Sequence, residues 1–301
     1  MNFLKNKNFI LLTNKFFLLI LISFFNIGVL ECAPKEWDWT FQSPASSYMM
    51  HLVEFHDYLV LYLGIVAILI SWIIARTIAL FKGKFYIFEG EKFTHSETLE
   101  IVWTLVPAAI LLLIAAPSFT LLYRYALELS SYSWWSSNSN IISVKVIGHQ
   151  WYWSYEYSNE SWVWLDKSKY IISFDFDSYM VATDDLTFGS YRLLEVDNRL
   201  LLPFKGKIRF LVTSTDVLHA FAVPSLGIKL DACPGRLSAV WSVLGKKGLF
   251  FGQCSEICGI NHGFMPIAVY VTDYKEYIMW CLVNSSEVLS TEFVTYKKEL
   301  N

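Results

Sequence analysis

The sequence predicts two transmembrane α-helices that form a hairpin, followed by an all-β sandwich. Two uncharged stretches of 18 and 23 residues lie in the first half, at 58–75 and 101–123. From residue 141 onward, apolar and polar residues alternate in short runs separated by turn residues, which is typical of β-strands. The composition agrees, because 54% hydrophobic residues exceed the share of about 45–50% in ordinary soluble proteins. Part of the chain therefore belongs in a lipid bilayer.

Residues 1–33 have the features of an export leader. An uncharged apolar run at 16–30 follows three lysines, and it is shorter than the roughly 20 residues that a transmembrane helix requires. We therefore expect the leader to be removed near Cys32, although Glu31 is a poor residue for a cleavage site. The segment 34–57 would then lie on the outer side of the membrane.

The stretches 58–75 and 101–123 are each long enough to cross about 30 Å of hydrocarbon as an α-helix. The connection between them, 76–100, carries one arginine and three lysines. Basic connections stay on the cytoplasmic or matrix side of a membrane. The chain after Arg124 would therefore face the periplasm or the mitochondrial intermembrane space, beginning with a linker at 124–140 that is rich in Ser and Asn.

Glu100 lies where the second apolar stretch begins. An acid at a helix N-terminus is stabilised by the helix dipole. Ionisable groups at a membrane edge also mark proton or ion routes. The residues alone leave these two interpretations open.

The β domain is expected at 141–280, with a C-terminal tail at 281–301. Apolar residues alternate in IISVKVIG, KIRFLVTS and MPIAVYV, and again at Ala239, Trp241 and Val243. Several short strands over a segment of about 140 residues are typical of a β-sandwich.

The strongest concentration of metal-binding side chains is CSEICGINHGFM at 254–265. Cys254, Cys258, His262 and Met265 combine thiolate, imidazole and thioether groups, the soft donors that select copper over calcium or magnesium. Three other interpretations stay open here. The cysteines could form a disulfide in an oxidising compartment, they could join His262 in a zinc site, or Met265 could simply fill the core.

A further ligand is expected from outside this loop. His219, at the end of the alternating run that begins at KIRFLVTST, is the first candidate, and His149 is its rival. A single blue-copper site uses two His, one Cys and a weak axial Met, so this sequence has one thiolate too many. Two bridging thiolates fit a dinuclear copper centre, in which His219 and His262 bind one metal each and Met265 and a backbone carbonyl are weak ligands.

The charge pattern argues against one class of partner and suggests another. The formal net charge is −3, and no run of Lys and Arg argues for nucleic acid. Residues 170–198 hold six acids against one arginine, a local field that would steer a basic partner. A charge run of this kind is also common on a solvated surface.

Several motifs together resemble the family of cytochrome c oxidase subunit 2, a part of the haem-copper terminal oxidase of respiration. They are TLEIVWTLVPA (98–108), GHQWYWSYEY (148–157), RLLEVDNRLLLP (192–203), DVLHAFAVPSLGIKLDACPGR (216–236) and GQCSEICGINHGFMPI (252–267). The resemblance covers roughly residues 40–280 and implies that the β-sandwich is cupredoxin-like.

The resemblance implies a dinuclear copper centre and a role for each matching residue. The two cysteines would bridge the coppers, with His219 and Met265 on one metal and with His262 and the carbonyl of Glu256 on the other. The Glu256 side chain is similar to the family's magnesium ligand at the interface with subunit 1. The copper ligands implied by the resemblance are His219, Cys254, Glu256, Cys258, His262 and Met265.

The resemblance also implies residues for electron transfer, for proton uptake and for docking of a partner protein. Trp151 is similar to the residue through which cytochrome c delivers its electron, and Glu100 to the acid at the mouth of a proton-uptake route. Acids that would help to dock basic cytochrome c are Glu156, Glu195, Asp197 and Asp216.

The family thus implies a subunit that accepts electrons from reduced cytochrome c and passes them to the haem of subunit 1, where oxygen is reduced to water with proton pumping. The expected partners are cytochrome c, subunit 1, further oxidase subunits and the lipid bilayer. The expected location is the mitochondrial inner membrane with the copper domain in the intermembrane space, the bacterial plasma membrane being the second choice.

Two alternatives conflict with the residues. A quinol oxidase subunit would lack the copper ligands, and a membrane-tethered copper-binding protein outside an oxidase would not need an aromatic motif such as GHQWYWSYEY. The chain departs from the family pattern in extra sequence at 158–173, which includes Trp162 and Trp164, and in its tail. Cys233 replaces an aliphatic residue and is expected to be a small buried side chain, and Cys281 is expected to be a tail thiol.

Overall fold

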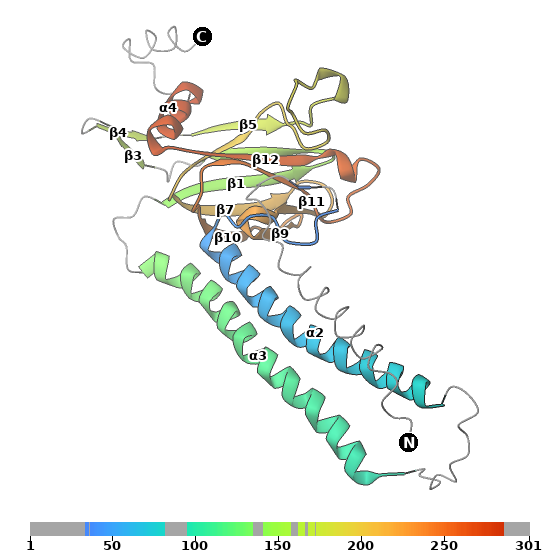
Figure 1. Cartoon of the computed structure of the whole chain (residues 1–301). Coiled ribbons are helices and arrows are strands. Elements are labelled where there is room, and N and C mark those ends of the chain that lie inside the picture. The colour runs from blue at the N-terminus through green and yellow to red at the C-terminus, as the bar shows by residue number, and fades with distance from the viewer. Residues whose placement is uncertain are drawn as a thin grey trace. The chain divides into compact units, whose positions relative to one another are not determined.

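The computed structural model describes residues 34–35, 37–81, 95–134, 141–157, 162–165, 168–171 and 173–285. They form a pair of long helices and a β domain (Figure 1). The expected leader at 1–33, the three lysines of the connection and the side chains of Trp162 and Trp164 lie outside the described residues.

Two long helices make up the hairpin: α2 spans Ser47–Phe81 and α3 spans Glu97–Trp134. They contain 35 and 38 residues, more than the predicted spans of 18 and 23. The pattern of uncharged residues detects only the part inside the hydrocarbon, whereas helical hydrogen bonding continues through the polar residues at each end. Each helix contains a segment that is long and apolar enough to cross a membrane, with mean hydropathies of 2.5 and 2.3.

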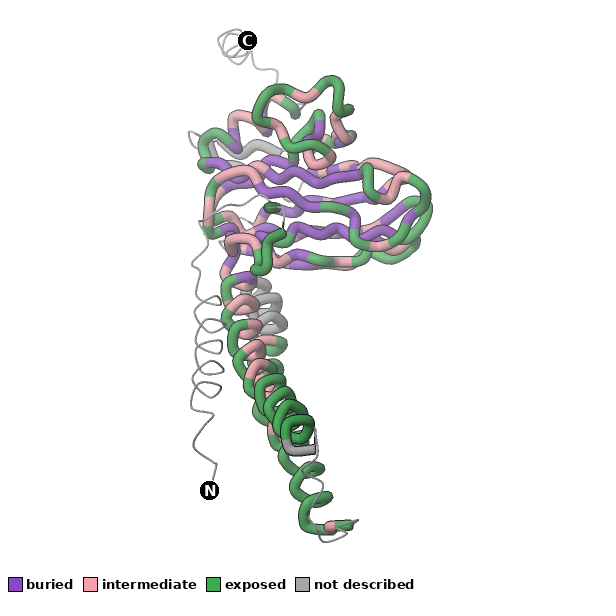
Figure 2. The backbone as a smooth tube through the Cα atoms, turned by 45° about the vertical axis from the view of Figure 1, so that its right-hand side comes forward, coloured by how far each residue is buried: buried purple, intermediate pink, exposed green. Residues whose placement is uncertain are grey.

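The two helices run side by side (Figure 1), and most of their described residues are exposed (Figure 2), including many large apolar ones. Arg124 Nη1 of α3 lies 3.3 Å from His51 Nε2 of α2 and links them near one end. In the β domain the buried residues instead line the inside (Figure 2). An outward apolar surface on long helices is expected where they face lipid or other membrane subunits.

The β domain contains twelve described strands. They are β1 Ile141–His149, β2 Tyr152–Tyr157, β3 Trp162–Leu165, β4 Ser168–Ile171, β5 Phe174–Ser178, β6 Leu200–Pro203, β7 Lys207–Ser214, β8 His219–Val223, β9 Ile228–Ala232, β10 Ser238–Val243, β11 Gly248–Cys254 and β12 Pro266–Thr272. One sheet has the order β10-β7-β1-β2-β5, a second has β6-β12-β11-β8-β9, and β3 pairs with β4 alone. Most neighbours are antiparallel, as the alternation predicts, but β1 with β7 and β12 with β6 are parallel.

The core lies between the two five-stranded sheets. Strand β7 shows the clearest pattern, because every second residue is buried, and Phe210 on it meets Phe221 of the opposite sheet with ring centroids 5.9 Å apart. Each sheet has one apolar face that must be covered, and facing sheets cover each other. The chain therefore forms the predicted β-sandwich.

Strand β10 forms where the alternation predicts it, but it buries the opposite face. The alternation of Ala239, Trp241 and Val243 marks the strand, but the side chains buried on it are Val240 and Ser242. Trp241 lies on the outer face, with the Arg209 guanidinium 5.6 Å from its ring centre. A cation over an aromatic ring stabilises the ring at a partly exposed position. Alternation of apolar residues therefore does not show by itself which face of this strand is buried.

The chain after β12 is also different from the prediction. A helix, α4, spans Tyr274–Asn284, so the expected tail at 281–301 begins inside a helix. Cys281 is fully buried there, and this burial raises the pKa of its thiol to about 12. Cys233, expected to be buried, is partly exposed.

The segment before α2 attaches the hairpin to the β domain. The Ala45 N–H donates to the Ser225 carbonyl at 2.7 Å, and the Gly245 N–H donates to the Ala45 carbonyl at 2.7 Å. The Ser46 hydroxyl donates to the Leu226 carbonyl at 2.7 Å and is buried. Backbone pairing of this kind connects the start of α2 directly to the sheet structure.

Candidate metal centre

Two strands and one loop bring the predicted ligand residues together. Strand β8 begins at His219, β11 ends at Cys254, and the loop after β11 carries the other candidates. Cys254 pairs with Phe221, two residues beyond His219 on β8. This close pairing needs Gly252, because a Cβ atom there would collide with the carbonyl oxygen of Ala222.

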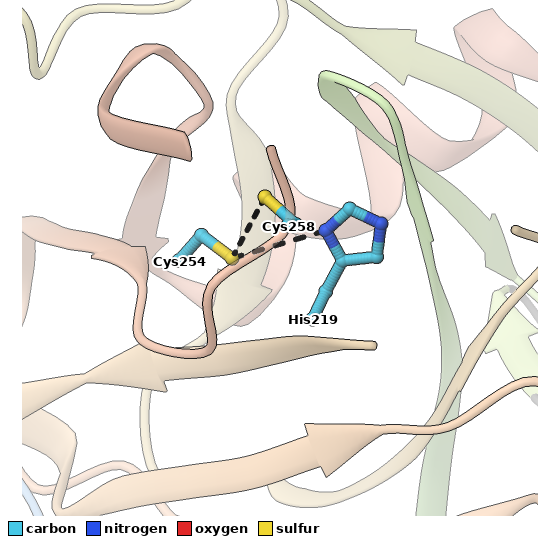
Figure 3. A group of neighbouring side chains, drawn as sticks. All are labelled: His219, Cys254 and Cys258. Atoms are coloured by element: carbon cyan, nitrogen blue, oxygen red, sulfur yellow. Dashed lines mark hydrogen bonds between the residues drawn. The ribbon is translucent and has the colours of Figure 1, made fainter. Parts of the chain in front are cut away.

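The donor atoms converge in a small buried region. His219 Nδ1 and the sulfur atoms of Cys254 and Cys258 lie within 4.8 Å of one another and point toward one another (Figure 3). The two sulfurs are 3.9 Å apart, whereas a disulfide bond measures about 2.05 Å. Both thiols are free, so the disulfide interpretation does not describe this structure.

The remaining predicted donors flank these two thiols. Cys258 Sγ lies 3.5 Å from His262 Nδ1 and 3.5 Å from Met265 Sδ. Cys254 Sγ lies 3.3 Å from the carbonyl oxygen of Glu256. Met265 is buried, but its sulfur contacts a thiol rather than only apolar groups. With the imidazole at the start of β8, the site offers two thiols, two imidazoles, a thioether and a carbonyl.

This donor set fits a dinuclear copper centre. Thiolate, imidazole and thioether are the ligands that copper prefers in proteins, and each thiol has one imidazole beside it. A tetrahedral zinc site would take four donors and leave the thioether and the carbonyl without a role. The two adjacent thiols could instead be shared by two metals.

The two thiols differ in acidity. Burial raises the pKa of Cys254, but hydrogen bonds with His219 and with the backbone of Ala220 and Glu256 outweigh this effect and bring the pKa to about 7. Burial, and then the charge of Cys254, raises the pKa of Cys258 to about 12. Metal binding to either thiol requires loss of its proton, and the neighbours of Cys254 favour that loss more than those of Cys258.

Asp216 orients the first imidazole. Its Oδ1 lies 2.8 Å from His219 Nε2, and its carboxylate also accepts the N–H groups of Gln150 and Val217, each at 2.6 Å. A hydrogen bond at Nε2 leaves Nδ1 of the buried ring to face the thiols. The sequence prediction gave Asp216 only a docking role. The spacing of three residues from a candidate ligand was the available signal for this second role.

Trp151 contacts the metal loop directly. Its indole Nε1 donates to the Cys258 carbonyl at 3.2 Å, and the Gln150 side chain donates to the same oxygen at 2.7 Å. The indole is half-buried and packs against the core. A partly exposed aromatic ring thus touches the backbone of one predicted bridging residue. Sequence reasoning did not identify Gln150.

His149, the rival ligand, lies outside the cluster. Its Nδ1 is 2.8 Å from the Thr215 hydroxyl, and its ring stacks on Tyr152 with centroids 4.6 Å apart. Burial lowers the pKa of His149. The structure therefore gives this histidine an aromatic and hydrogen-bonding environment rather than a place beside the thiols.

The predicted docking acids occupy different environments. Glu156 is partly exposed and pairs with Lys145 at 2.8 Å. Asp197 is exposed, and its carboxylate accepts the N–H of Tyr179 at 2.8 Å. Glu195 is an exception, because its side chain is only 9% exposed and forms an ion pair at 2.8 Å with an arginine four residues later. Its charge is therefore largely withdrawn from the surface.

Glu100 lies on the membrane hairpin, away from the cluster of thiols in sequence and in fold. It belongs to the first turn of α3, and its Oε1 is 3.1 Å from His95 Nδ1. Its side chain is about half exposed, at 47%. Both earlier interpretations, dipole stabilisation and a proton route, are compatible with this position.

Comparison with known proteins gives matches over most of the chain. The family model described as cytochrome c oxidase subunit II, periplasmic domain, matches residues 142–272, and its transmembrane-domain counterpart matches residues 34–121. Subunit 2 of cytochrome c oxidase from Phytophthora megasperma is 46% identical and aligns with 82% of this chain and 86% of its own length. The same subunit from Cyanidium caldarium is 42% identical and aligns with 86% and 95%. Among solved structures, the periplasmic domain of subunit II of cytochrome oxidase from Bradyrhizobium japonicum is 45% identical over 48% of this chain and 92% of its own, with a TM-score of 0.39.

Proposed function

Because the chain belongs to the family of cytochrome c oxidase subunit 2, we propose that it accepts electrons from reduced cytochrome c at a dinuclear copper centre and passes them to the haem of subunit 1. The chain is a subunit of an oxidoreductase, the haem-copper oxidase complex, in which oxygen is reduced to water. The alternative of a membrane-tethered copper-binding protein outside an oxidase has no support among its relatives. The proposal depends chiefly on one observation, the convergence of six donors, of which two are adjacent thiols.

Each donor has a definite place in the proposed centre. The two cysteines would bridge the metals, with one imidazole on each and the thioether and carbonyl as weaker ligands. When bound, the copper pair supplies a site that takes up and releases one electron. The proposed ligands are His219, Cys254, Glu256, Cys258, His262 and Met265.

The metal content of the full-length chain tests this proposal. The chain would be purified in detergent, loaded with copper, and studied by metal analysis and electron paramagnetic resonance. We expect two coppers per chain and a seven-line hyperfine pattern, because one electron spin is shared by two nuclei. One copper with four lines, or a preference for zinc, would contradict the dinuclear assignment.

We propose that Trp151 receives the electron from cytochrome c. The contacts that support this role are the hydrogen bond from its indole to the Cys258 carbonyl and the half-buried position of the ring. An electron that reaches the indole would be one hydrogen bond away from the backbone of a bridging ligand.

We propose that exposed acids of the β domain dock cytochrome c, with Glu156, Asp197 and Asp216 available and Glu195 largely withdrawn. Replacing Glu156 with glutamine would remove one negative charge and leave the positive charge of Lys145 unpaired. We expect the KM for cytochrome c to rise roughly two- to fivefold at low ionic strength, the scale of one exposed ion pair. The difference should disappear in high salt. Glu54→Gln on α2, an exposed acid outside the β domain, is the matched control, and an equal effect there would contradict the docking role.

We propose that Glu100 belongs to a proton-uptake route into subunit 1, which fits an acid at the membrane edge of α3. Replacing Glu100 with glutamine should slow steady-state turnover by about tenfold, because a carboxyl group that relays protons contributes at least that much. Glu97→Gln is the matched control, since Glu97 lies in the same turn and is more exposed. Equal turnover of both variants would leave Glu100 with only its effect on the helix dipole.

Two finer proposals concern a second metal and the location. The Glu256 carboxylate would bind magnesium at the interface with subunit 1, because magnesium prefers carboxylate oxygens. Glu256→Gln should then lower the magnesium content of the purified oxidase without changing its copper content. The β domain would face the intermembrane space, so a protease should cleave it in mitochondria whose outer membrane alone has been opened.

A further inference from the structure

We propose that Gly148 and Trp153 position two ligands of the copper centre, the imidazole of His219 and the residue Met265. The two residues are partners across β1 and β2 in the aligned register. Both contact the ligand residues and not the metal itself. The inference rests on the proposed copper function, and it explains why the motif GHQWYW begins with glycine and ends with a second tryptophan.

Gly148 makes room for the imidazole. A Cβ atom at Gly148 would lie 2.9 Å from His219 Cδ2, 3.0 Å from Cγ and 3.1 Å from Cβ. These distances are shorter than ordinary carbon contacts of about 3.5–4.0 Å. The ring of His219 therefore occupies the space that any other residue at position 148 would fill with its side chain.

The backbone does not require a glycine at this position. Gly148 lies inside strand β1, and it is not among the glycines with positive φ. A glycine inside a strand is less stable than an alanine, because it loses more backbone entropy on folding and has no side chain to pack. Since an alanine would suit the backbone better, the space for the imidazole is the physical reason for glycine.

Trp153 borders the same space and reaches a second ligand. Its indole is fully buried and meets the His219 ring edge to face, with centroids 6.0 Å apart and planes at 64°. Its Nε1 donates to the Met265 carbonyl at 3.1 Å. One rigid side chain thus contacts both residues that we assign to the same copper.

These contacts leave the imidazole little freedom. Gly148 lies against one side of the ring, Trp153 against another, and the Asp216 carboxylate binds Nε2 at 2.8 Å. The remaining ring nitrogen, Nδ1, faces Cys254. A methyl group at position 148 would push the ring away from this arrangement, because Trp153 and Asp216 block the other directions.

The test compares three variants of the full-length chain in detergent: Gly148→Ala, Trp153→Phe and Gly263→Ala. Copper affinity is measured by competition with a chelator, the spectrum by electron paramagnetic resonance, and the fold of the metal-free chain by circular dichroism. We expect at least a tenfold loss of copper affinity and an altered hyperfine pattern in Gly148→Ala, because residues that orient metal ligands are worth roughly 10- to 100-fold in affinity. Trp153→Phe keeps an aromatic ring but loses the hydrogen bond to Met265, so we expect a smaller loss and a shifted spectrum.

Gly263→Ala is the matched control, because a Cβ atom there meets no other atom within 4 Å although the residue lies between two proposed ligands. Its affinity and spectrum should equal those of the unaltered chain. A folded Gly148→Ala with unchanged affinity and spectrum would overturn the inference, as would an equal loss in Gly263→Ala. If metal-free Gly148→Ala does not fold, Trp153→Phe decides, and an unchanged spectrum there overturns the inference. Failure of the unaltered chain to bind a copper pair would instead refute the proposed function.

Discussion

Replacing Cys254 with serine is expected to abolish the dinuclear copper centre and, with it, the oxidation of cytochrome c by the assembled oxidase. Cys254 Sγ is the atom that lies near His219 Nδ1, Cys258 Sγ and the Glu256 carbonyl at once. A serine hydroxyl keeps its proton at neutral pH and is a hard donor, so it cannot replace a thiolate that copper prefers. We expect the seven-line spectrum to disappear and turnover with cytochrome c to fall to background.

Cys233→Ser is the matched control for this experiment, because Cys233 is a free cysteine outside the cluster and partly exposed. It should retain two coppers and normal turnover. Circular dichroism of the metal-free chains separates a lost ligand from a lost fold. Two coppers and an unchanged spectrum in Cys254→Ser would contradict the ligand assignment.

Replacing Trp151 with phenylalanine is expected to slow cytochrome c oxidation while the copper centre stays intact. The phenyl ring fills part of the space, but it lacks the Nε1 donor that contacts the Cys258 carbonyl at 3.2 Å. We expect turnover to fall about a hundredfold. A shift of about 1 Å in the position of a reacting group can lower a rate by that factor. The copper count and the paramagnetic spectrum should not change, since the copper ligands themselves are untouched.

Trp241→Phe is the control for the loss of a tryptophan as such. Trp241 lies on the outer face of β10 and contacts Arg209 rather than the metal loop. Its replacement should leave turnover unchanged. Normal turnover in Trp151→Phe would show that the electron reaches the centre by another path.

Much of the fold could be read from the sequence because hydrophobicity is a local property. Uncharged runs long enough for a bilayer identify a hairpin, and strict alternation identifies strands such as β7, whose every second residue is buried. Alternation is weaker where a polar residue is buried and an aromatic one is exposed. On β10 the buried positions are Val240 and Ser242, and only the packing of the two sheets decides this face.

The candidate site was readable in part for a chemical reason. Four soft donors within twelve residues are rare enough to indicate a metal loop without any structure. The contributions of residues far from that loop were not readable, because they depend on strands that meet only in the folded chain. Gln150 holds the carbonyl of Cys258, 108 positions along the chain, and no spacing indicates this contact, whereas the spacing of Asp216 from His219 left a local signal.

By itself, the sequence determined the hairpin, the sandwich and the set of soft donors, because run length, alternation and side-chain chemistry are properties of neighbouring residues. Only the tertiary structure decided which donor faces which. The pairing of β11 with β8 places Cys254 beside His219, and the pairing of β1 with β2 places Gly148 and Trp153 around the same ring. These contacts join residues that are up to about a hundred positions apart in the chain. They form only when the protein interior is closely packed, which no local sequence pattern records.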